Sequence, residues 1–362
     1  MKIDSFKIKE YTRRMAAPLH LAHGVISVRR GVIIRIVTED GLTGWGEAAP
    51  LAGFSPDTLE TTTETLTRIT GSIPGKEVHD SIGRIREMVG EIVPTGAPAA
   101  KFGLETALCD LAAQASGQPL CAWLAAKPLA TVAVNYLITG PDIDWPKVKS
   151  EFDSGGYKTV KIKVGGGTPD DDIALVRKIR RLLGDNIAIR LDANRRWSFD
   201  TALRVLGGLR GCRIDYVEEP LTEGTPEAMG RLNAETGIRI ALDESLGEVG
   251  QTEEIVALGG VDVLIVKPTV MGGIAGAMRL AEMARRHGQQ VVISSTFESE
   301  IGLVTLVHLA AAICADHIAC GLNTMSAFED KLAPELLLVT DGGIRVLQDP
   351  GLGLPAGWWE MT

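Results

Sequence analysis

The sequence predicts an α/β fold built around a barrel of parallel strands. Three observations indicate it: short apolar segments that end in a charged or hydroxyl residue, their regular spacing, and helical stretches between them. The segments are Thr159–Lys163, Ile187–Asp192, Ile214–Glu218, Ile238–Asp243, Val263–Lys267 and Val291–Ser295. Their ends lie about 25–30 residues apart, the length of one strand–helix unit in a barrel of roughly 250 residues. We therefore expect charged side chains at the carboxyl-terminal rim, where such barrels hold their active sites.

The first 125 residues predict a small α+β domain. Strands and a turn are expected at residues 3–8, 31–37, 39–41 and 44–47. Two loops that contain proline and glycine, Pro18–Gly24 and Ala48–Phe54, are expected to border a cleft. A helix is expected to begin after Ser55, because serine is a good N-cap and proline follows it. Helical periodicity continues over residues 82–92 and 97–116.

The barrel is expected to begin with a strand at residues 131–136 and to close with one at 318–321. The helices between strands are expected at residues 144–154, 169–183, 198–209, 226–236, 251–258, 274–287 and 299–314. The tail predicts a hairpin from residues 334–339 and 344–346 that packs back on the first domain. The chain then divides into a capping domain (1–125), a catalytic barrel (126–325) and a C-terminal segment (326–362).

The composition indicates a large core and excludes several classes of partner. With 362 residues, 45% of them hydrophobic, the chain can bury a core larger than that of one small domain. Its net charge of −9 argues against nucleic acid or an anionic membrane as partner. We find no signal peptide, no apolar run long enough to span a bilayer and no metal-binding cysteine spacing. We expect a cytoplasmic protein with a small-molecule substrate; whether it forms a homo-oligomer is left open.

Three carboxylates end three successive predicted strands: Asp192, Glu218 and Asp243. Because the carboxyl ends of barrel strands meet at one rim, their side chains should converge. An all-oxygen, triply anionic site without nearby Cys or His suits Mg²⁺, or Mn²⁺, and disfavours zinc. Acidic residues at strand ends can also cap helices, but that explains one such residue better than three in consecutive units.

Lysines flank this acidic cluster. Lys161 and Lys163 lie two apart on one strand, so both should point into the barrel, and Lys267 approaches from the other side. Burying an ammonium group is costly unless anions lie nearby. A lysine next to a divalent cation and a second lysine has its pKa lowered, so it can act as a base near pH 7. Arg190, two residues before Asp192, should also face inward and tie the carboxylates together.

Five motifs in this order resemble the enolase superfamily, and within it the muconate lactonizing enzyme group. They are Lys161-Ile-Lys163, Leu191-Asp-Ala-Asn194, Glu218-Glu-Pro220, Asp243-Glu-Ser245 and Lys267-Pro268. The resemblance implies a modified TIM barrel, (β/α)7β, with an N-terminal α+β capping domain completed by the C-terminal tail. It also implies abstraction of a proton alpha to a carboxylate, with the three acidic residues on Mg²⁺. Lys163 is then the base, Lys161 tunes it, and Lys267 faces the substrate from the opposite side.

Three segments are similar to the o-succinylbenzoate synthase family of menaquinone biosynthesis: Gly44–Ser55, Lys267–Gly273 and Val292–Leu303. That resemblance implies a lyase, which dehydrates 2-succinyl-6-hydroxy-2,4-cyclohexadiene-1-carboxylate to 2-succinylbenzoate through an enediolate. Lys267 would remain protonated and stabilise the enediolate by a cation–π contact. The substrate contacts expected on this basis are Ser294, Ser295, Arg190, Asn194, Phe54 and His23.

Other activities stay open at this stage. Racemisation of N-succinylamino acids, or epimerisation of dipeptides, would use Lys163 and Lys267 as two opposed bases. Dipeptide epimerases usually carry Asp-x-Asp at the end of the eighth strand, where this chain has Gly321-Leu-Asn323. Muconate cycloisomerase would favour a glycine-rich strand end in place of Ser294 and Ser295. A Schiff-base aldolase would need an inward lysine but not three carboxylates, and a binding protein gains nothing from buried charge.

Overall fold

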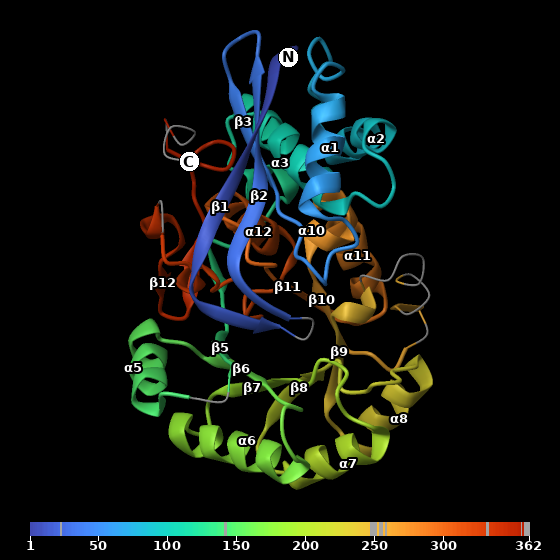
Figure 1. Cartoon of the computed structure of the whole chain (residues 1–362), viewed down its shortest axis with the longest axis vertical. Helices are drawn as coiled ribbons and strands as arrows, with labels where there is room; N and C mark the ends of the chain where they lie inside the picture. The colour runs from blue at the N-terminus through green and yellow to red at the C-terminus, as the bar shows by residue number, and fades with distance from the viewer. Residues whose placement is uncertain are drawn as a thin grey trace.

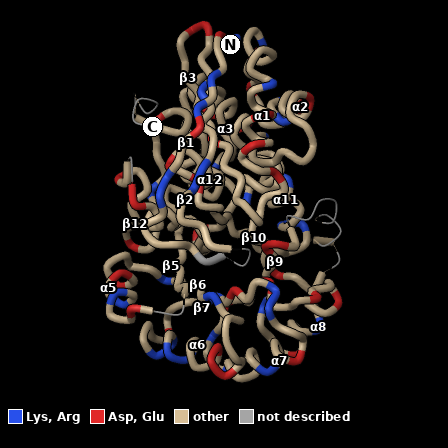
Figure 2. The backbone as a smooth tube through the Cα atoms, viewed as in Figure 1, with Lys and Arg blue, Asp and Glu red and all other residues tan. Residues whose placement is uncertain are grey.

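The computed structural model describes residues 1–21, 24–140, 143–246, 252, 256–257, 259–330, 333–355 and 357. It is a parallel barrel with an N-terminal capping domain above it in the view of Figure 1. Basic and acidic residues are interspersed along the backbone of both parts (Figure 2). Within the described ranges, no helix combines the length and the apolar character needed to cross a membrane.

The capping domain contains an antiparallel sheet of β1 (Ile3–Leu21), β2 (Gly24–Thr38) and β3 (Thr43–Ala48). The predicted loop at residues 18–24 is wrong, because the hairpin continues and Leu19 pairs with Ile26. Pro18 falls where the register shifts between Arg14 and Leu19, so the strand absorbs it as an irregularity and does not end there. The long hairpin therefore reaches from the capping domain towards the barrel (Figure 1).

The helices of the capping domain are α1 (Leu59–Ile69), α2 (Ile82–Ile92), α3 (Pro98–Ala115) and α4 (Leu120–Leu124). Helix α1 begins later than predicted, with Thr58 as its N-cap. Ser55 is not the cap because its hydroxyl accepts a hydrogen bond from Leu51 N at 2.8 Å. Helix α3 packs closely on β3, where a Cβ on Gly46 would lie 1.9 Å from Gly103 O. Glycine at position 46 therefore permits this contact.

The barrel strands form one parallel sheet in chain order, as the spacing predicts. They are β5 (Tyr136–Ile138), β6 (Thr159–Lys163), β7 (Ala188–Asp192), β8 (Ile214–Glu218), β9 (Arg239–Leu242), β10 (Val263–Val266) and β11 (Gln290–Ile293). The ring closes through the predicted last strand, where Cys320 bridges to Val134 and Gly321 bridges to Ser294. The predicted (β/α)7β barrel is thus confirmed, and its inward positions below the rim form a separate apolar cluster: Tyr216, Ala241, Val263, Ile265, Val292 and Ile318.

Helices cover the outside of the barrel (Figure 1). They are α5 (Trp145–Gly155), α6 (Pro169–Leu183), α7 (Phe199–Gly208), α8 (Pro226–Thr236), α10 (Pro268–Met271), α11 (Ile274–Arg286) and α12 (Glu300–Ile313). Several begin at a side-chain N-cap, for example Thr168 on α6 and Ser198 on α7. The predicted helix at residues 251–258 lies mostly outside the described residues.

The C-terminal tail forms a hairpin of β12 (Val339–Thr340) and β13 (Gly343–Arg345). This hairpin pairs with β4 (Thr131–Ala133), at the start of the barrel, and not with the capping domain as predicted. Pro334–Leu337 is a 3-10 helix and not a strand. A later part of the tail does reach the capping domain, since Leu352 N donates to Asp110 Oδ1 at 2.8 Å. The strand expected at residues 131–136 is therefore divided: β4 forms a three-stranded sheet with the tail hairpin, and β5 is the first strand of the barrel sheet.

Two buried carboxylates of the capping domain bind the amino termini of barrel helices. Glu105 Oε2 accepts a hydrogen bond from Ala275 N at the start of α11, at 3.1 Å. Glu47 accepts hydrogen bonds from Ser299 N at 2.7 Å and from Gly302 N at 2.8 Å, at the start of α12. A negative charge at a helix amino terminus is stabilised by the free N–H groups and the helix dipole. These two contacts join the capping domain to the barrel.

Glu105 should make the stability of the protein depend on pH. Burial raises its pKa to about 7, although hydrogen bonds from the α11 backbone and the charge of Lys101 oppose the shift. The pKa of Glu105 in the unfolded chain is near 4.5, so the folded protein binds this proton more tightly than the unfolded chain does. The folded state is therefore most stabilised below about pH 4.5, and this stabilisation is lost as the pH rises through 7. Relative to Glu105→Gln, the wild-type free energy of unfolding should fall by about 3 kcal/mol between pH 4.5 and 8.

Urea unfolding at several pH values measures this difference. Glu87→Gln is the matched control, because Glu87 is an exposed glutamate on the neighbouring helix α2. Its stability should stay parallel to that of the wild type at every pH. A difference between wild type and Glu105→Gln that does not change with pH would contradict the prediction.

Candidate active site

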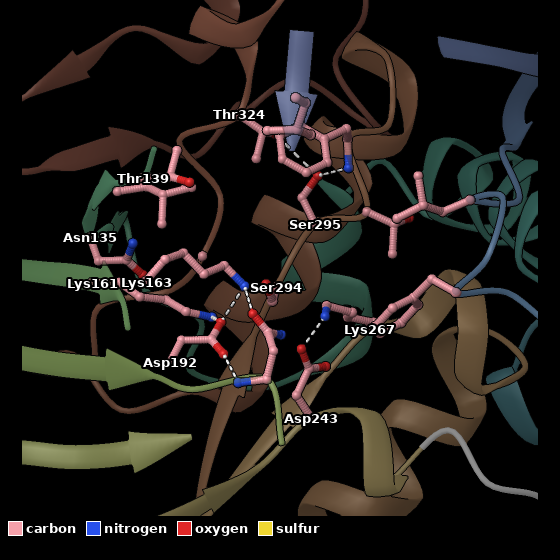
Figure 3. A pocket seen from close by; sticks show the side chains of 18 of the residues that line it. Asn135, Thr139, Lys161, Lys163, Asp192, Asp243, Lys267, Ser294, Ser295 and Thr324 are labelled. Carbon is pink, nitrogen blue, oxygen red and sulfur yellow. Dashed lines mark hydrogen bonds and ion pairs between the residues drawn. The ribbon is translucent and has the colours of Figure 1, made fainter. Parts of the chain in front are cut away.

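A pocket lies at the carboxyl-terminal rim of the barrel, with the capping domain forming one wall (Figure 3). Its charged residues come from the ends of β6, β7, β9 and β10, and the capping domain adds apolar side chains. The barrel side is lined by Lys161, Lys163, Asp192, Asn194, Asp243, Glu244, Lys267 and Ser294–Phe297. The capping side is lined by Leu19, Leu51, Ala52 and Phe54. The pocket thus combines a charged floor with an apolar wall.

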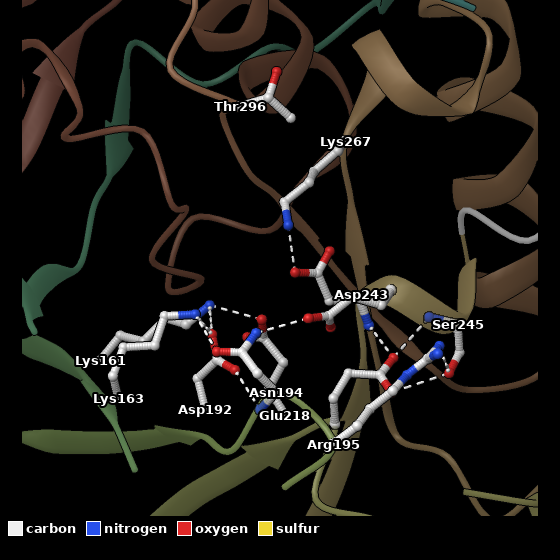
Figure 4. A network of polar contacts seen from close by, with 12 residues as sticks. Lys161, Lys163, Asp192, Asn194, Arg195, Glu218, Asp243, Ser245, Lys267 and Thr296 are labelled. Carbon is white, nitrogen blue, oxygen red and sulfur yellow. Dashed lines mark hydrogen bonds and ion pairs between the residues drawn. The ribbon is translucent and has the colours of Figure 1, made fainter. Parts of the chain in front are cut away.

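Lys161 and Lys163 point into the barrel from β6, as the two-residue spacing predicts (Figure 4). Lys163 Nζ donates to Asp192 Oδ2 and to Asn194 Oδ1, each at 2.7 Å. Lys161 Nζ lies 2.8 Å from Asp192 Oδ2 and 2.7 Å from Glu218 Oε1. The two ammonium groups therefore offset part of the free-energy cost of placing two carboxylates inside the barrel.

Lys267 enters the pocket from the side opposite Lys163 (Figure 3). Its ammonium group pairs with Asp243 and lies 4.1 Å from the centroid of the Phe54 ring. Both contacts stabilise a positive charge, one as an ion pair and one as a cation–π interaction. The predicted residues Phe54, Lys163 and Lys267 are thus gathered around one pocket.

The charges in the floor shift one another's pKa. Burial alone would raise the pKa of Asp192, but Lys161 and Lys163 outweigh it and hold the pKa well below its ordinary range. For Lys161, burial lowers the pKa, yet the surrounding carboxylates raise it well above the ordinary value. Burial and the charge of Asp192 together raise the pKa of Glu218. Among these groups, Glu218 is the one whose charge is least compensated.

The three predicted metal ligands fit a divalent cation by their chemistry. All are buried carboxylates, and Glu218 Oε2 and Asp243 Oδ1 have no hydrogen-bond partner within the described structure. A buried carboxylate oxygen without a partner is unfavourable unless a cation or donor binds it. In their present positions, no three acidic, histidine or cysteine side chains among the described residues are gathered closely enough to hold a metal. The ammonium groups of Lys161, Lys163 and Lys267 lie beside these carboxylates.

Glu219 holds the strand-end loops in place. It is buried, and its Oε1 accepts hydrogen bonds from Asp243 N and Ser245 N, each at 2.9 Å. Its Oε2 accepts from Arg195 Nε at 3.0 Å. A single side chain therefore fixes the backbone that carries Asp243. The motif Glu218-Glu-Pro220 contains this residue, but its sequence alone does not separate the two roles.

The two predicted serines have different surroundings. Ser295 Oγ donates to Glu298 Oε2 at 2.5 Å and accepts from Phe297 N at 2.9 Å. Its hydroxyl proton is therefore already used in a hydrogen bond within the protein. Ser294 lines the pocket beside Gly321, where an added Cβ would lie 2.6 Å from Ser294 Oγ. A side chain at position 321 would therefore require the Ser294 hydroxyl to move.

Arg190, an expected substrate contact, does not line this pocket. Arg190 lies one inward layer below Asp192, where its Nε donates to Asp215 Oδ2 at 2.9 Å and its guanidinium stacks 4.8 Å from the Tyr216 ring centroid. Residues two apart on a strand share a face but lie at different depths, so Arg190 joins the barrel interior and not the rim. His23 lies outside the described residues.

Several pocket residues were not predicted from the sequence. They are Asn135, Leu137, Thr139, Thr324 and Glu244. Thr139 directly follows β5, but the strand was expected to end at residue 136, so the sequence did not place Thr139 at a strand end. Glu244 stands within a quoted motif and accepts a hydrogen bond from Asn194 Nδ2 at 2.7 Å. Leu19 lies in Pro18–Gly24, the segment that was expected to border a cleft, but it reaches the pocket as part of the hairpin and not of a loop.

Fold and site together define a capped parallel barrel with paired lysines and carboxylates at its rim. Residues 147–356 match the family model described as enolase C-terminal domain-like. Residues 3–124 match the mandelate racemase/muconate lactonizing enzyme N-terminal domain. The chain therefore belongs to the enolase superfamily, in the muconate lactonizing enzyme group.

The relatives carry several different activities. An o-succinylbenzoate synthase of Aliivibrio fischeri is 32% identical, covering 90% of this chain and 92% of the relative. A hydrophobic dipeptide epimerase of Enterococcus faecalis is 31% identical, covering 86% and 88%. The solved dipeptide epimerase of E. faecalis, complexed with Mg and L-Leu-L-Tyr, superposes with a TM-score of 0.87 at 28% identity, over 98% and 99% of the two chains. The chain is thus similar to enzymes that share a fold but differ in reaction.

Proposed function

We propose that this protein is an o-succinylbenzoate synthase, which dehydrates 2-succinyl-6-hydroxy-2,4-cyclohexadiene-1-carboxylate to 2-succinylbenzoate. The observation that carries the proposal is the neutral end of the eighth strand, where Gly321, Asn323 and Thr324 line the pocket. A dipeptide has a free ammonium group that needs a carboxylate there, and neither Gly321 nor Asn323 supplies one. A substrate without an ammonium group fits this wall better.

The apolar wall supports the same proposal. Leu19, Leu51 and Phe54 offer a surface for a six-membered ring, while Lys163 and Lys267 reach the pocket from opposite sides. The similarity to the A. fischeri synthase over most of both chains adds to this support. The Gly44–Ser55 segment, which carries part of the apolar wall, is one of the segments that resemble this family.

In the proposed reaction, Lys163 as a neutral amine removes the proton alpha to the substrate carboxylate. The resulting enediolate expels the neighbouring hydroxyl group, and the Lys163 ammonium returns the proton to it, so that water and the aromatic product form. Lys267 remains charged, held by Asp243 and Phe54, and stabilises the enediolate. A divalent cation held by Asp192, Glu218 and Asp243 would supply further positive charge beside the substrate carboxylate.

Racemisation of N-succinylamino acids is the second candidate. Two lysines on opposite sides of the pocket favour it, because racemisation needs a base on each face of the alpha carbon. Its substrate shares a carboxylate and a succinyl group with the cyclohexadiene. The two reactions differ in the role of Lys267, which is a base in one and a fixed charge in the other.

A pair of assays separates the candidates: turnover of the cyclohexadiene, and loss of optical activity of an N-succinylamino acid. Lys267→Ala should lower dehydration by about 10²–10³-fold, because a preorganised charge is lost. Lys267→Arg keeps the charge and should restore most of the dehydration, whereas a two-base racemase should remain inactive with arginine. Equal loss of dehydration in both variants would contradict the role of Lys267 as a fixed charge.

A further inference from the structure

Arg29 is a buried arginine that binds only carbonyl oxygens among the described residues. It lies on β2 with 3% of its surface exposed. Its guanidinium donates to Ala49 O at 2.6 Å, to Pro50 O at 2.7 Å and to Phe297 O at 3.1 Å, with a longer contact to the carbonyl of its neighbour at 3.3 Å. A buried charge is costly unless it is hydrogen-bonded, so each segment that contributes a carbonyl to Arg29 is held in its position.

Two of these carbonyls belong to the base of the apolar loop, which we define as Leu51–Phe54. The loop is a compact turn, because Phe54 N donates to Leu51 O at 3.0 Å and Ser55 N donates to the same oxygen at 2.8 Å. Leu51 and Phe54 line the pocket, and the Phe54 ring contacts Lys267. Because the turn is closed within itself, its position depends on the segment that holds its base.

The third carbonyl belongs to the opposite wall, which we call the barrel loop, Ser294–Phe297. Phe297 has a φ of 61°, a backbone conformation that is unfavourable for a bulky residue. Glu298 supports the loop from inside, accepting hydrogen bonds from Thr296 N at 2.8 Å and from Ser295 Oγ. Phe297 O is the atom that links this loop to the capping domain through Arg29.

We infer that Arg29 is a positioning residue that sets the distance between the apolar loop and the barrel loop, and thereby selects the substrates that the pocket accepts. A guanidinium is planar and presents N–H donors in several fixed directions, so it can hold three carbonyls from two loops at once. A lysine at position 29 would have a single side-chain nitrogen, which cannot present donors in the same fixed directions. The inference depends on the proposed function only in the kinetic test, which uses the cyclohexadiene as substrate.

The test compares Arg29→Lys and Arg29→Gln with the wild type, using Arg30→Gln as the matched control. Arg30 is the next residue on β2 but is exposed and pairs with Glu10 at the surface. Amide hydrogen exchange should rise at residues 49, 51–54 and 297 in both Arg29 variants, while the rest of the barrel keeps its protection. Arg30→Gln should exchange like the wild type.

In the dehydration assay, Arg29→Gln should lower kcat/KM by about 10²-fold, as expected when a misplaced wall loosens the fit of the substrate. Most of that loss should be in KM, because Lys163 and its partners are untouched, and Arg29→Lys should recover part of it. A loss of thermal stability with unchanged KM would overturn the inference and leave Arg29 a structural residue.

The two proposals fail in different ways. Should the wild type not dehydrate the cyclohexadiene, the proposed function fails, yet the exchange measurement still decides the role of Arg29. Unchanged exchange at both loops in Arg29→Lys and Arg29→Gln would overturn the inference whatever the substrate is.

Discussion

Replacing Lys163 by alanine should lower kcat for dehydration by about 10³–10⁴-fold, the contribution expected from a general base and acid. Lys163 points into the pocket and contacts Asp192 and Asn194, both at the rim. The fold should survive, because Asp192 keeps Lys161 at 2.8 Å as a partner. Steady-state kinetics with the cyclohexadiene measures the effect, and circular dichroism verifies folding.

Lys158→Ala is the matched control for this substitution. Lys158 immediately precedes the same strand, β6, but is exposed at its other end. It should keep wild-type kinetics. Near-wild-type dehydration by Lys163→Ala would mean that another group removes the proton, and the assignment of the base would be wrong.

Removal of divalent cations should abolish turnover, and added Mg²⁺ should restore it. The physical reason lies in Glu218 Oε2 and Asp243 Oδ1, which are buried and have no hydrogen-bond partner within the described structure. A cation bound there should also stabilise the fold, by about 2.7 kcal/mol at a concentration 100 times its Kd. Unfolding curves with and without Mg²⁺ therefore report binding independently of activity.

Glu218→Gln should lose both the restoration by Mg²⁺ and the stabilisation. Glu223→Gln, which changes an exposed glutamate in the loop after β8, should keep both. Full activity after exhaustive chelation, with no effect of Mg²⁺ on unfolding, would contradict the metal site and the proposed role of these carboxylates.

Much of the barrel could be predicted from the sequence because its signals are local. Each strand is indicated by five or six consecutive residues that are mostly apolar and end in a charged or hydroxyl residue. The same pattern returns about 25–30 residues later in the next strand–helix unit. Side-chain direction alternates along a strand, so Lys161, Lys163 and Asp192 could be placed on the inner face without a structure. The alternation does not tell how far below the rim an inward side chain lies. Arg190 was therefore expected at the rim, beside the carboxylates, whereas it lies one layer of inward side chains below it.

The walls of the pocket could not be predicted in the same way. The first two strands were expected at residues 3–8 and 31–37, with a loop at 18–24, but pairing across the sheet carries the first strand to Leu21 and brings Leu19 to the pocket. Nothing near Arg29 in the sequence distinguishes it from the exposed Arg30. Its role depends on Phe297, which is 268 residues away along the chain.

The sequence by itself determined the barrel, the family resemblance and the set of charged side chains at the rim, because period and alternation belong to each segment alone. Only the tertiary structure decided which lysine pairs with which carboxylate, how deeply Arg190 is buried and which loops enclose the pocket. These properties arise from contacts between segments that are distant in the sequence. The free energy of each such contact depends on how deeply it is buried, and burial is produced only when the segments pack together.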